Sequence, residues 1–332
     1  MDLSRFPRFH LAHLPTPLEP LTNLSRHLDG PDIYVKRDDC TGLAGGGNKT
    51  RKLEFLVADA LAQGADTLVT VGATQSNHVR QSIAAAAKAG LSIEVLLERR
   101  MSRDDDYAEN GNVMLDHMLG GVVHHCGPVD DLNVEGEKLA EKLKAEGRDV
   151  YFFPAGGSSP VGTLGYSSCA TEILEQAGAM GLGMDAMVVA CGSQGTQAGL
   201  LVGLAVADAA VPVLGISVGR SRDELEPKVH ALANETAAYM GLDRSIGRDA
   251  VTCDDAYFGD GYGEPTEAMV EAVTLCARLE GLLLDPVYTG KAMSGLIAKI
   301  RAGDYRKGQS VVFIHTGGQV ALHAYKTAFT GR

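Results

Sequence analysis

The sequence lacks the features of a nucleic-acid-binding, secreted or membrane-spanning protein. It contains no block of five or more basic residues, and its formal net charge is −12. Neither nucleic acid nor an anionic membrane is therefore an expected partner. No apolar run near the first residue has the length of a signal peptide, and none elsewhere reaches the roughly 18 residues of a membrane span. We expect a cytoplasmic protein whose partner is a small molecule.

The sequence also lacks the cysteine spacing of a metal site or a disulfide framework. Its six cysteines are scattered without a CxxC pair, which favours buried, reduced thiols and predicts no bound metal. Cys40 and Cys191 lie beside glycine-rich segments, so either thiol could line a pocket without reacting.

Glycine is abundant, with 40 residues that gather in short runs between periodic segments. The glycines do not recur at every third position, which excludes a collagen-like repeat. Glycine clusters at the ends of strands let the backbone approach a ligand closely. The pattern is typical of an α/β enzyme that holds a small ligand.

Strand and helix signals alternate from about residue 50 to the end of the chain. Helices are expected at 50–63, 77–89, 110–119, 130–145, 196–208, 223–241 and 290–301, and strands at 66–71, 92–98, 122–126, 150–154, 185–190, 211–218 and 310–315. Short apolar strands between helices predict two largely parallel sheets, each covered by helices on both faces. A ligand should lie beyond the carboxyl ends of the strands. The glycine-rich turn near 158–162 is the expected boundary between the halves.

The segment 45–52 places Lys49 where a glycine-rich turn meets the first turn of a helix. The helix N-terminus and partial burial both disfavour the ammonium form of this lysine. A neutral amine is what Schiff-base chemistry requires. From position alone, a solvated basic cluster of Lys49 with Arg51 and Lys52 is an equally good interpretation. The segment is not a Walker loop, because it lacks the GxxxxGK[ST] pattern after a strand.

The segment 192–199 follows a strand and opens a helix. Its backbone N–H groups and the helix dipole converge on one anion, and Ser193 and Thr196 add hydroxyl donors. It lacks the lysine of a nucleoside-triphosphate loop and the GxGxxG spacing of a dinucleotide fold. A lone phosphate, such as that of pyridoxal-5′-phosphate (PLP), fits it better. An ordinary glycine-rich turn is the alternative.

Polar groups also follow the expected strand that ends near residue 71. Hydroxyl and amide groups of residues 72–78 could bind a carboxylate at the N-terminus of the next helix. Ser76 or Asn77 could equally serve only as the cap of that helix. His78 by itself is more often a structural histidine than a catalyst.

Two tyrosines and a threonine complete the candidate residues. Tyr262 and Tyr288 each offer a flat face for stacking and a titratable hydroxyl, although each taken singly is more often a packed aromatic side chain. Thr316 follows the last expected strand, where its hydroxyl could meet a ring nitrogen.

Together these motifs resemble the aminocyclopropane-carboxylate deaminase/D-cysteine desulfhydrase family, which has the tryptophan-synthase-β-like (type II) PLP fold. The motifs, in the order seen in that family, are KRDD (36–39), GGGNKTRKLEF (45–55), QSNH (75–78), GSQGTQAG (192–199), GYGEP (261–265), DPVYTGKA (285–292) and HTGG (315–318). The resemblance covers nearly the whole chain. It implies a larger PLP-binding domain from residues 1–48 and 162–332, a smaller domain from residues 49–161, and an active site in the cleft between them.

The resemblance also implies a cofactor site. Lys49 would hold PLP as a Schiff base, with Asn48 near the ring hydroxyl. Thr316 would meet the pyridine nitrogen, and Tyr288 would stack beside the ring. The phosphate would be held by Ser193, Gln194, Gly195 and Thr196.

For the substrate, the resemblance implies that Ser76 and Asn77, with Gln75 beside them, hold the carboxylate, and that Tyr262 points into the pocket. Lys49 would be the base for an L-amino acid, and Ser76 or a tyrosine could serve another geometry. The resemblance further implies a homodimer.

Three activities compete within the family. The deaminase has glutamate after the tyrosine of its Tyr-Glu-Gly-Lys motif, where this chain has Thr289, and this departure argues against opening of the cyclopropane ring. Residues 36–42, Thr50 and residues 110–116 look closer to L-cysteate sulfo-lyase. We therefore expect β-elimination of L-cysteate to pyruvate, ammonia and sulfite. D-cysteine desulfhydration, which releases hydrogen sulfide, is the alternative, and aminocyclopropane-carboxylate deamination is less favoured.

Two other classes of protein compete with this interpretation. A non-catalytic amino-acid sensor would keep the phosphate loop but need not keep Lys49, Tyr262 and Tyr288 together. A nucleotide-dependent oxidoreductase is suggested only by the alternation of strands and helices, and the sequence has no GxGxxG with a downstream acidic residue. The colour of the purified protein discriminates, because PLP makes a protein yellow without added nicotinamide.

Overall fold

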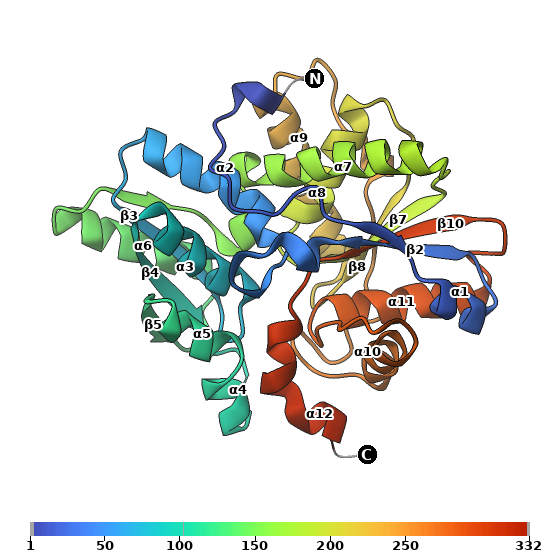
Figure 1. Ribbon diagram of the computed structural model, residues 1–332. Helices are drawn as coiled ribbons and strands as arrows, with labels where there is room; N and C mark the ends of the chain where they lie inside the picture. The colour runs from blue at the N-terminus through green and yellow to red at the C-terminus, as the bar shows by residue number, and fades with distance from the viewer. Residues whose placement is uncertain (1–2, 102, 331–332) are drawn as a thin grey trace.

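The computed structural model describes residues 3–101 and 103–330 and contains two β-sheets (Figure 1). The six-stranded sheet has the order β1 (Leu18–Pro20), β2 (Asp32–Arg37), β10 (Ser310–His315), β7 (Ala186–Cys191), β8 (Val213–Ser217), β9 (Thr252–Asp254). The four-stranded sheet has the order β5 (Val122–Cys126), β4 (Ser92–Glu98), β3 (Thr67–Ala73), β6 (Val150–Phe152). The pair β1–β2 is antiparallel and the other described pairs are parallel. The prediction of an α/β chain with two largely parallel sheets is confirmed.

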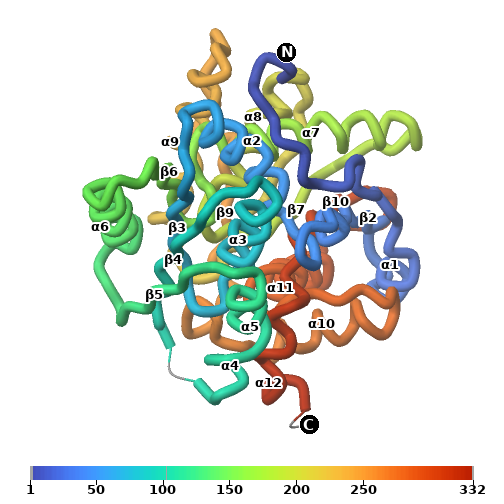
Figure 2. The backbone as a smooth tube through the Cα atoms, turned by 60° about the vertical axis from the view of Figure 1, so that its left-hand side comes forward, coloured from blue at the N-terminus to red at the C-terminus, as the bar shows by residue number. Residues whose placement is uncertain are grey.

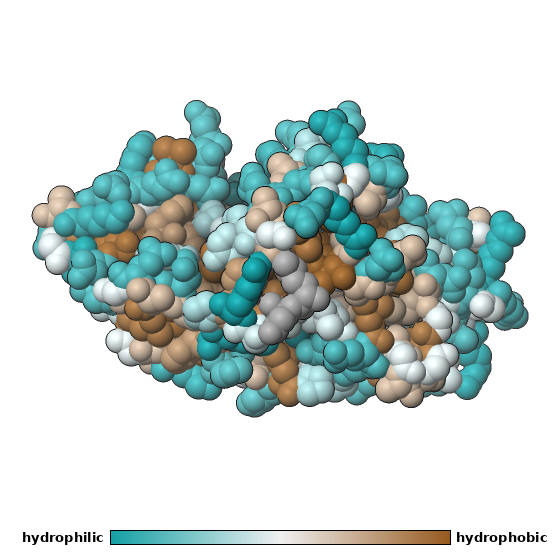
Figure 3. All heavy atoms as spheres, turned by 90° about the horizontal axis from the view of Figure 1, so that it is seen from above, coloured by the Kyte–Doolittle hydropathy of each residue, from teal (hydrophilic) through white to brown (hydrophobic). Residues whose placement is uncertain are grey.

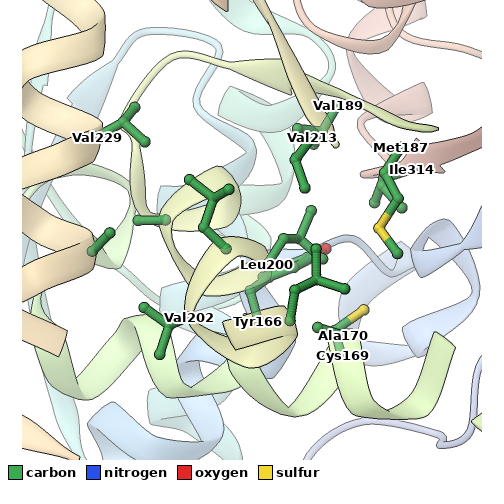
Figure 4. Packing of buried hydrophobic residues seen from close by; sticks show 14 of the residues in the cluster. Tyr166, Cys169, Ala170, Met187, Val189, Leu200, Val202, Val213, Val229 and Ile314 are labelled. Atoms are coloured by element: carbon green, nitrogen blue, oxygen red, sulfur yellow. The ribbon is translucent and has the colours of Figure 1, made fainter. Parts of the chain in front are cut away.

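Alternate residues of β7 belong to two different cores of the six-stranded sheet. Met187 and Val189 pack among residues of one group of helices, whereas Ala186 and Val188 pack on the opposite face. Figure 4 shows Met187 and Val189 in the first of these cores, with Met187 beside Ile314. The first group is α7 (Pro160–Met180), α8 (Gly195–Val206) and α9 (Arg222–Tyr239), and the second is α1 (Thr22–Leu28), α10 (Glu267–Glu280) and α11 (Thr289–Ala302). This burial on both faces explains the continuous apolar run of β7.

The four-stranded sheet is covered in the same way. Leu68 packs with residues of α2 (Lys49–Ala62) and α3 (Asn77–Ala89), whereas Val69 packs with α6 (Leu132–Ala145). The remaining short helices are α4 (Asp105–Glu109), α5 (Asn112–Met118), α12 (Lys326–Thr330) and six 3₁₀ turns at Leu3–Arg5, Asp38–Thr41, Leu43–Gly45, Ala155–Gly157, Arg248–Ala250 and Gln319–Tyr325. Figure 2 shows α5 beside α3, with the first and last described residues at opposite ends of the molecule.

A buried ion network joins the start of α2 to β2 and α7. Arg51 donates from Nε to Asp38 Oδ2 at 2.8 Å and from Nη2 to Glu172 Oε1 at 2.9 Å, and Arg51 and Asp38 are fully buried. Burial alone would raise the pKa of Asp38, but the Arg51 guanidinium lowers that pKa below its ordinary value. Removing one partner would leave an uncompensated buried charge, so this network holds the turn that precedes Lys49.

The observed helices and strands agree best with the predicted ones where local capping signals are strong. Helix α3 covers the predicted residues because Ser76 caps its N-terminus and Gly90 ends it in the left-handed conformation at φ 72°. The strands at 92–98, 122–126 and 310–315 also match. The elements that were not predicted include the strands β1, β2 and β9 and the helices α1, α7 and α10. The four-stranded sheet lies within residues 49–161, but the division into domains stays a prediction.

The surface seen from above is mostly polar, and hydrophobic residues appear on it in small groups (Figure 3). Within residues 3–101 and 103–330, no helix is both long and apolar enough to cross a membrane.

Candidate active site

The predicted site residues meet in one cavity of about 490 Å³. Some reach it from the carboxyl ends of β3, β7 and β10, which belong to the two different sheets, and the others come from the start of α2 and from the segments before α10 and α11. The predicted residues that line the cavity are Asn48, Lys49, Ser76, Asn77, Ser193, Gln194, Thr196, Tyr262, Tyr288 and Thr316. A ligand site beyond the carboxyl ends of parallel strands is the arrangement expected for open α/β sheets.

Lys49 is the first residue of α2, directly after a turn that only glycine can form. Gly46 has φ 75°, and a Cβ atom built on it would lie 1.9 Å from the carbonyl oxygen of Asp39. The Nζ of Lys49 donates to Asn48 Oδ1 at 3.0 Å. Burial lowers the pKa of this lysine to about 8. The neutral amine, the form that covalent catalysis by lysine requires, is therefore more accessible than in an ordinary lysine.

Asn48 ties the turn before Lys49 to the first turn of α8 and to the segment that follows β10. Its Nδ2 donates to Thr196 Oγ1 at 3.0 Å, and its backbone N–H donates to the carbonyl of Thr316 at 3.0 Å. These bonds hold three segments that are far apart in the sequence in one fixed arrangement.

The loop after β7 has the shape of an anion cradle. It precedes α8, and Gln194 adopts φ 65°, so the chain turns sharply before the helix N-terminus. The hydroxyl of Ser158 donates to Ser193 Oγ at 3.1 Å and adds a polar group beside the loop. Gly195 is buried and is not among the residues that line the cavity.

Lys52 stands beside this loop and was not predicted to take part in the site. It is fully buried, its Nζ donates to the carbonyl of Gly156 at 3.1 Å, and a Cβ atom on Gly195 would lie 2.7 Å from that Nζ. No carboxylate of the described residues forms an ion pair with it, and burial lowers its pKa well below the ordinary value. The interpretation of Arg51 and Lys52 as a solvated basic cluster is wrong, since both are buried. A buried lysine without a counter-ion suits a bound phosphate.

The N-terminus of α3 offers two donors to the cavity. Ser76 Oγ accepts from the backbone N–H of Val79 at 3.2 Å, so its own hydroxyl hydrogen is free to donate. Asn77 Oδ1 accepts from Arg80 Nη1 and from Asn112 Nδ2, each at 3.0 Å. The Nδ2 of Asn77 is thereby the group left for a carboxylate.

Gln75 has a different environment from the one that the sequence suggested. Its Nε2 donates to the carbonyls of Tyr107 at 2.7 Å and Asn110 at 2.8 Å, and its Oε1 accepts from the backbone N–H of Asn112 at 3.0 Å. It is buried and does not line the cavity. The geometry gives Gln75 the task of holding residues 107–112 and does not favour contact with the substrate.

Tyr262 and Tyr288 form a hydroxyl pair on the cavity wall. Their phenolic oxygens lie 2.5 Å apart, and the ring of Tyr288 packs against Gly192. Burial raises the pKa of Tyr288 to about 12 and that of Tyr262 well above its ordinary value. Both hydroxyls therefore keep their protons at neutral pH.

The motif around Tyr288 is held by a buried carboxylate. Asp285 Oδ2 accepts from the backbone N–H groups of Val287 and Tyr288, each at 2.9 Å. Thr289 Oγ1 donates to Asp285 Oδ1 at 2.6 Å and accepts from the backbone N–H of Asp285 at 2.7 Å. The hydroxyl of Thr289 is thus used within the motif.

Thr316 directly follows β10, next to a neutral histidine that ends the strand. Burial lowers the pKa of His315. Its Nδ1 accepts from the backbone N–H of Gly317, so Nε2 is the nitrogen that donates to the carbonyl of Leu283. Thr316 is therefore the uncharged group that this strand presents to the cavity.

The PLP reading fits these residues on structural grounds. The cavity combines a lysine with a lowered pKa, a phosphate-sized cradle at a helix N-terminus, and a buried lysine that lacks a counter-ion. Across residues 3–101 and 103–330, no group of three or more histidine, cysteine, aspartate or glutamate side chains is placed to hold a metal ion.

A family model of pyridoxal-phosphate dependent enzymes matches residues 10–317. The chain belongs to this family. D-cysteine desulfhydrases of Salmonella typhi and of Salmonella newport (strain SL254) are each 48% identical to it over 324 residues, which cover 97% of this chain and 97% of the relative. The resemblance stated from the motifs is confirmed, and PLP is the cofactor of this enzyme.

Solved structures agree with this assignment. A crystal structure of an ACC deaminase homologue matches with a TM-score of 0.89 and 38% identity, covering 98% of this chain and 96% of that chain. An O-ureido-L-serine synthase matches with a TM-score of 0.66 at 19% identity, covering 92% and 90% of the two chains, and is similar in fold alone.

Proposed function

We propose that this enzyme is a carbon–sulfur lyase that converts D-cysteine and water to pyruvate, ammonia and hydrogen sulfide. The observation that carries the proposal is the meeting of the Lys49 amine and the Tyr262–Tyr288 hydroxyl pair in one cavity with an anion cradle. Relatives named D-cysteine desulfhydrase match nearly the full chain and support D-cysteine as the substrate.

This choice reverses the order expected from the motifs, which placed L-cysteate first. The similarity over 324 residues outweighs a likeness confined to residues 36–42, Thr50 and 110–116. L-Cysteate is kept as the second candidate, because cationic side chains line the cavity and could attract a sulfonate. They are Arg100, Arg220 and Lys228. The homodimer and the cytoplasmic location stay predictions.

Aminocyclopropane-carboxylate is the least favoured substrate. The residue after the tyrosine is Thr289, and its hydroxyl both donates to and accepts from Asp285. It offers no acidic partner of the kind that the deaminase motif carries at this position.

The cofactor residues follow from the geometry of the cavity. Lys49 would be the attachment point of PLP, Asn48 and Thr316 would contact the ring, and the loop of Ser193, Gln194, Gly195 and Thr196 would hold the phosphate. Lys52 would supply the positive charge that this phosphate needs. When bound, PLP supplies an electron sink that stabilises negative charge at the substrate Cα.

Residues of the chain bind the substrate, take the Cα proton and donate a proton to sulfur. Ser76 Oγ and Asn77 Nδ2 donate to the substrate carboxylate and fix the orientation of the Cα–H bond. The base depends on the enantiomer: the Lys49 amine would take the Cα proton of an L-amino acid, and Ser76 would serve a D-amino acid, because the tyrosine hydroxyls keep their protons. The tyrosine pair holds protons at neutral pH and can give one to the departing sulfur.

The test offers D-cysteine, L-cysteate and aminocyclopropane-carboxylate to the purified yellow enzyme and measures sulfide, sulfite and 2-oxobutyrate. The fastest release should be sulfide with pyruvate from D-cysteine. Faster sulfite release from L-cysteate would overturn the choice of substrate and leave the lyase assignment in place. A Lys49→Ala protein should lose both the visible absorbance and turnover, and survival of both would refute the role of Lys49.

A further inference from the structure

Arg100 places a guanidinium on the wall of the cavity beside the tyrosine pair. It follows β4, lines the cavity, and its Cζ lies 5.4 Å from the centroid of the Tyr262 ring. The cation thus packs against one of the two tyrosines that we assign to proton transfer. This contact fixes the side of the cavity on which the charge lies.

Glu98 anchors Arg100 and leaves the end of its side chain open. Oε2 of Glu98 accepts from Arg100 Nε, and Oε1 accepts from the backbone N–H of Val129 at 3.2 Å. Glu98 is buried, whereas 40% of the Arg100 side chain is exposed. The terminal amino groups of Arg100 make no hydrogen bond to the described part of the chain, so they remain available to a ligand.

The other cations of the site have different tasks or positions. Lys49 bonds to Asn48, and Lys52 lies against the phosphate loop. Arg220 follows β8 and Lys228 lies on α9, and both are exposed, as Arg100 is. Among the described cations that line the cavity, Arg100 alone makes a ring contact with the tyrosine pair.

We propose that Arg100 is the specificity-determining residue of this site, and that its guanidinium binds the β-substituent of the substrate as an anion, either thiolate or sulfonate. The proposal rests on the lyase function proposed above and adds to it the residue that recognises the β-substituent, which is the group to be eliminated. Arginine suits this task because its terminal N–H groups form charge-assisted hydrogen bonds with sulfur and oxygen anions.

The charge balance of the elimination agrees with this position. The electron pair of the Cα–H bond becomes the second bond between Cα and Cβ, and the pair of the Cβ–S bond leaves on sulfur. A cysteine bound as the thiolate needs one proton on sulfur as this bond breaks, and the adjacent Tyr262–Tyr288 pair can donate it, so that the group departs as HS⁻. The sulfonate of cysteate departs as sulfite without a proton. Arg100 neutralises the negative charge of the departing group, and HS⁻ takes its second proton from water to give hydrogen sulfide.

The test compares two D-amino acids of similar size that both yield pyruvate. D-Cysteine can carry a charge on its β-substituent, whereas β-chloro-D-alanine cannot. In PLP-loaded Arg100→Met, KM for D-cysteine at pH 8 should rise about tenfold or more, the effect of one charge-assisted hydrogen bond. KM for β-chloro-D-alanine should change less than about threefold, and Arg100→Lys should restore part of the loss. Arg99→Met, which alters an exposed arginine outside the cavity, is the matched control.

The pH dependence of KM provides a readout that a purely structural role would not move. An ordinary thiol has a pKa near 8.5, so KM of the wild-type enzyme for D-cysteine should fall as the pH rises from about 7 to 9. In Arg100→Met, KM for D-cysteine should depend on pH no more than KM for β-chloro-D-alanine does. The two substrates share the ionisations of the amino and carboxyl groups, so the comparison isolates the thiol. Equal increases in KM for both substrates, or a pH dependence that survives the substitution, would overturn the proposal.

The failure of this proposal can be told apart from failure of the proposed function. Suppose that the wild-type enzyme releases sulfide from D-cysteine but that Arg100→Met changes KM for D-cysteine and for β-chloro-D-alanine equally. Only the proposed role of Arg100 is then refuted. If wild-type activity is confined to L-cysteate, the choice of D-cysteine falls, and the same comparison is made with L-cysteate and β-chloro-L-alanine. The permanent sulfonate charge should then make the KM effect independent of pH between 7 and 9.

Discussion

The phenolic oxygens of Tyr262 and Tyr288 lie 2.5 Å apart on the cavity wall. Only one of the two hydroxyls can donate within the pair, so the proton of the other remains for a third group. Burial raises both pKa values, that of Tyr288 to about 12, and the pair therefore stays protonated at neutral pH. This arrangement suits a proton donor better than a base.

Loss of either hydroxyl should slow the proton transfer to sulfur. We expect Tyr288→Phe to lower kcat for D-cysteine by about 10²–10⁴, the usual contribution of a general acid, with a smaller change in KM. The measurement is pyruvate release at saturating substrate. The visible absorbance of the cofactor should persist, because Lys49 is unchanged. A kcat within about threefold of wild type would contradict the assignment.

Substitution of Lys52 should weaken the binding of PLP and at the same time stabilise the apoprotein. The amine of Lys52 is buried without a carboxylate partner among the described residues, and burial lowers its pKa. A bound phosphate would favour the ammonium form, so Lys52→Met should weaken PLP binding by about 10–100-fold, the loss of one charge-assisted hydrogen bond. The apoprotein should become more stable, because the variant removes a desolvated polar amine that lacks a counter-ion. Titration with PLP and thermal unfolding of the apoprotein give the two quantities. The exposed Lys88→Met is the control, and an apoprotein destabilised by Lys52→Met would refute the argument.

The sequence was sufficient for those parts of the fold that depend on neighbouring residues. The alternation of short apolar strands with helices predicts the two sheets, and the caps of α3 define its ends. Helix α7 was missed because its glycines resemble a turn. The structure explains such glycines by close packing: a Cβ atom on Gly165 of α7 would lie 2.4 Å from the carbonyl oxygen of Arg51, and one on Gly199 of the adjacent helix α8 would lie 2.5 Å from Tyr166 of α7. Such helix contacts are not visible in a linear pattern.

The candidate site also contains parts that the sequence predicts and parts that it does not. The turn before Lys49 and the loop at 192–196 were predictable because each has a local signature of glycines at the start of a helix. The roles of Lys52, Gln75 and Arg100 could not be predicted, because each depends on contacts with residues that lie about 30 to more than 100 positions away in the sequence. Family motifs identified Gln75 as a site residue, and only the structure reveals that its amide is used by residues 107–112.

Stability should fall strongly when Gln75 is replaced by a residue of the same size that has a hydrogen-bond acceptor in place of the donating Nε2. In Gln75→Glu, an oxygen replaces the Nε2 that donates to the carbonyls of Tyr107 and Asn110. Repulsion and two unsatisfied carbonyls should lower the free energy of unfolding by about 2–5 kcal/mol. KM should rise as well, because Asn112, which orients Asn77, loses its support.

Gln75→Met is the companion variant, since it removes the hydrogen bonds without adding a charge. Urea unfolding should place its stability between those of the wild type and Gln75→Glu. Equal stability of all three proteins would contradict the positioning role of Gln75.

Asp116 should make the stability of the enzyme depend on pH. It lies on α5, is fully buried, and neither carboxyl oxygen has a hydrogen-bond partner in the described residues. Burial raises its pKa to about 8, although Arg80 opposes the shift. Because the folded state binds this proton more tightly than the unfolded state does, the contribution is complete below about pH 4. It is lost as the pH rises toward 8.

Asp116→Asn cannot ionise, so it should remove this part of the pH dependence. Between pH 5.5 and 8.5 the wild-type holoenzyme should lose about 2–3 kcal/mol more of its free energy of unfolding than the variant does. The variant should be the more stable protein at pH 8.5. Urea unfolding at the two pH values measures both quantities, with the exposed Asp243→Asn as the control that keeps the wild-type slope. Identical slopes for wild type and Asp116→Asn would mean that Asp116 is already ionised in the folded enzyme, and that Arg80 compensates its charge in spite of its burial.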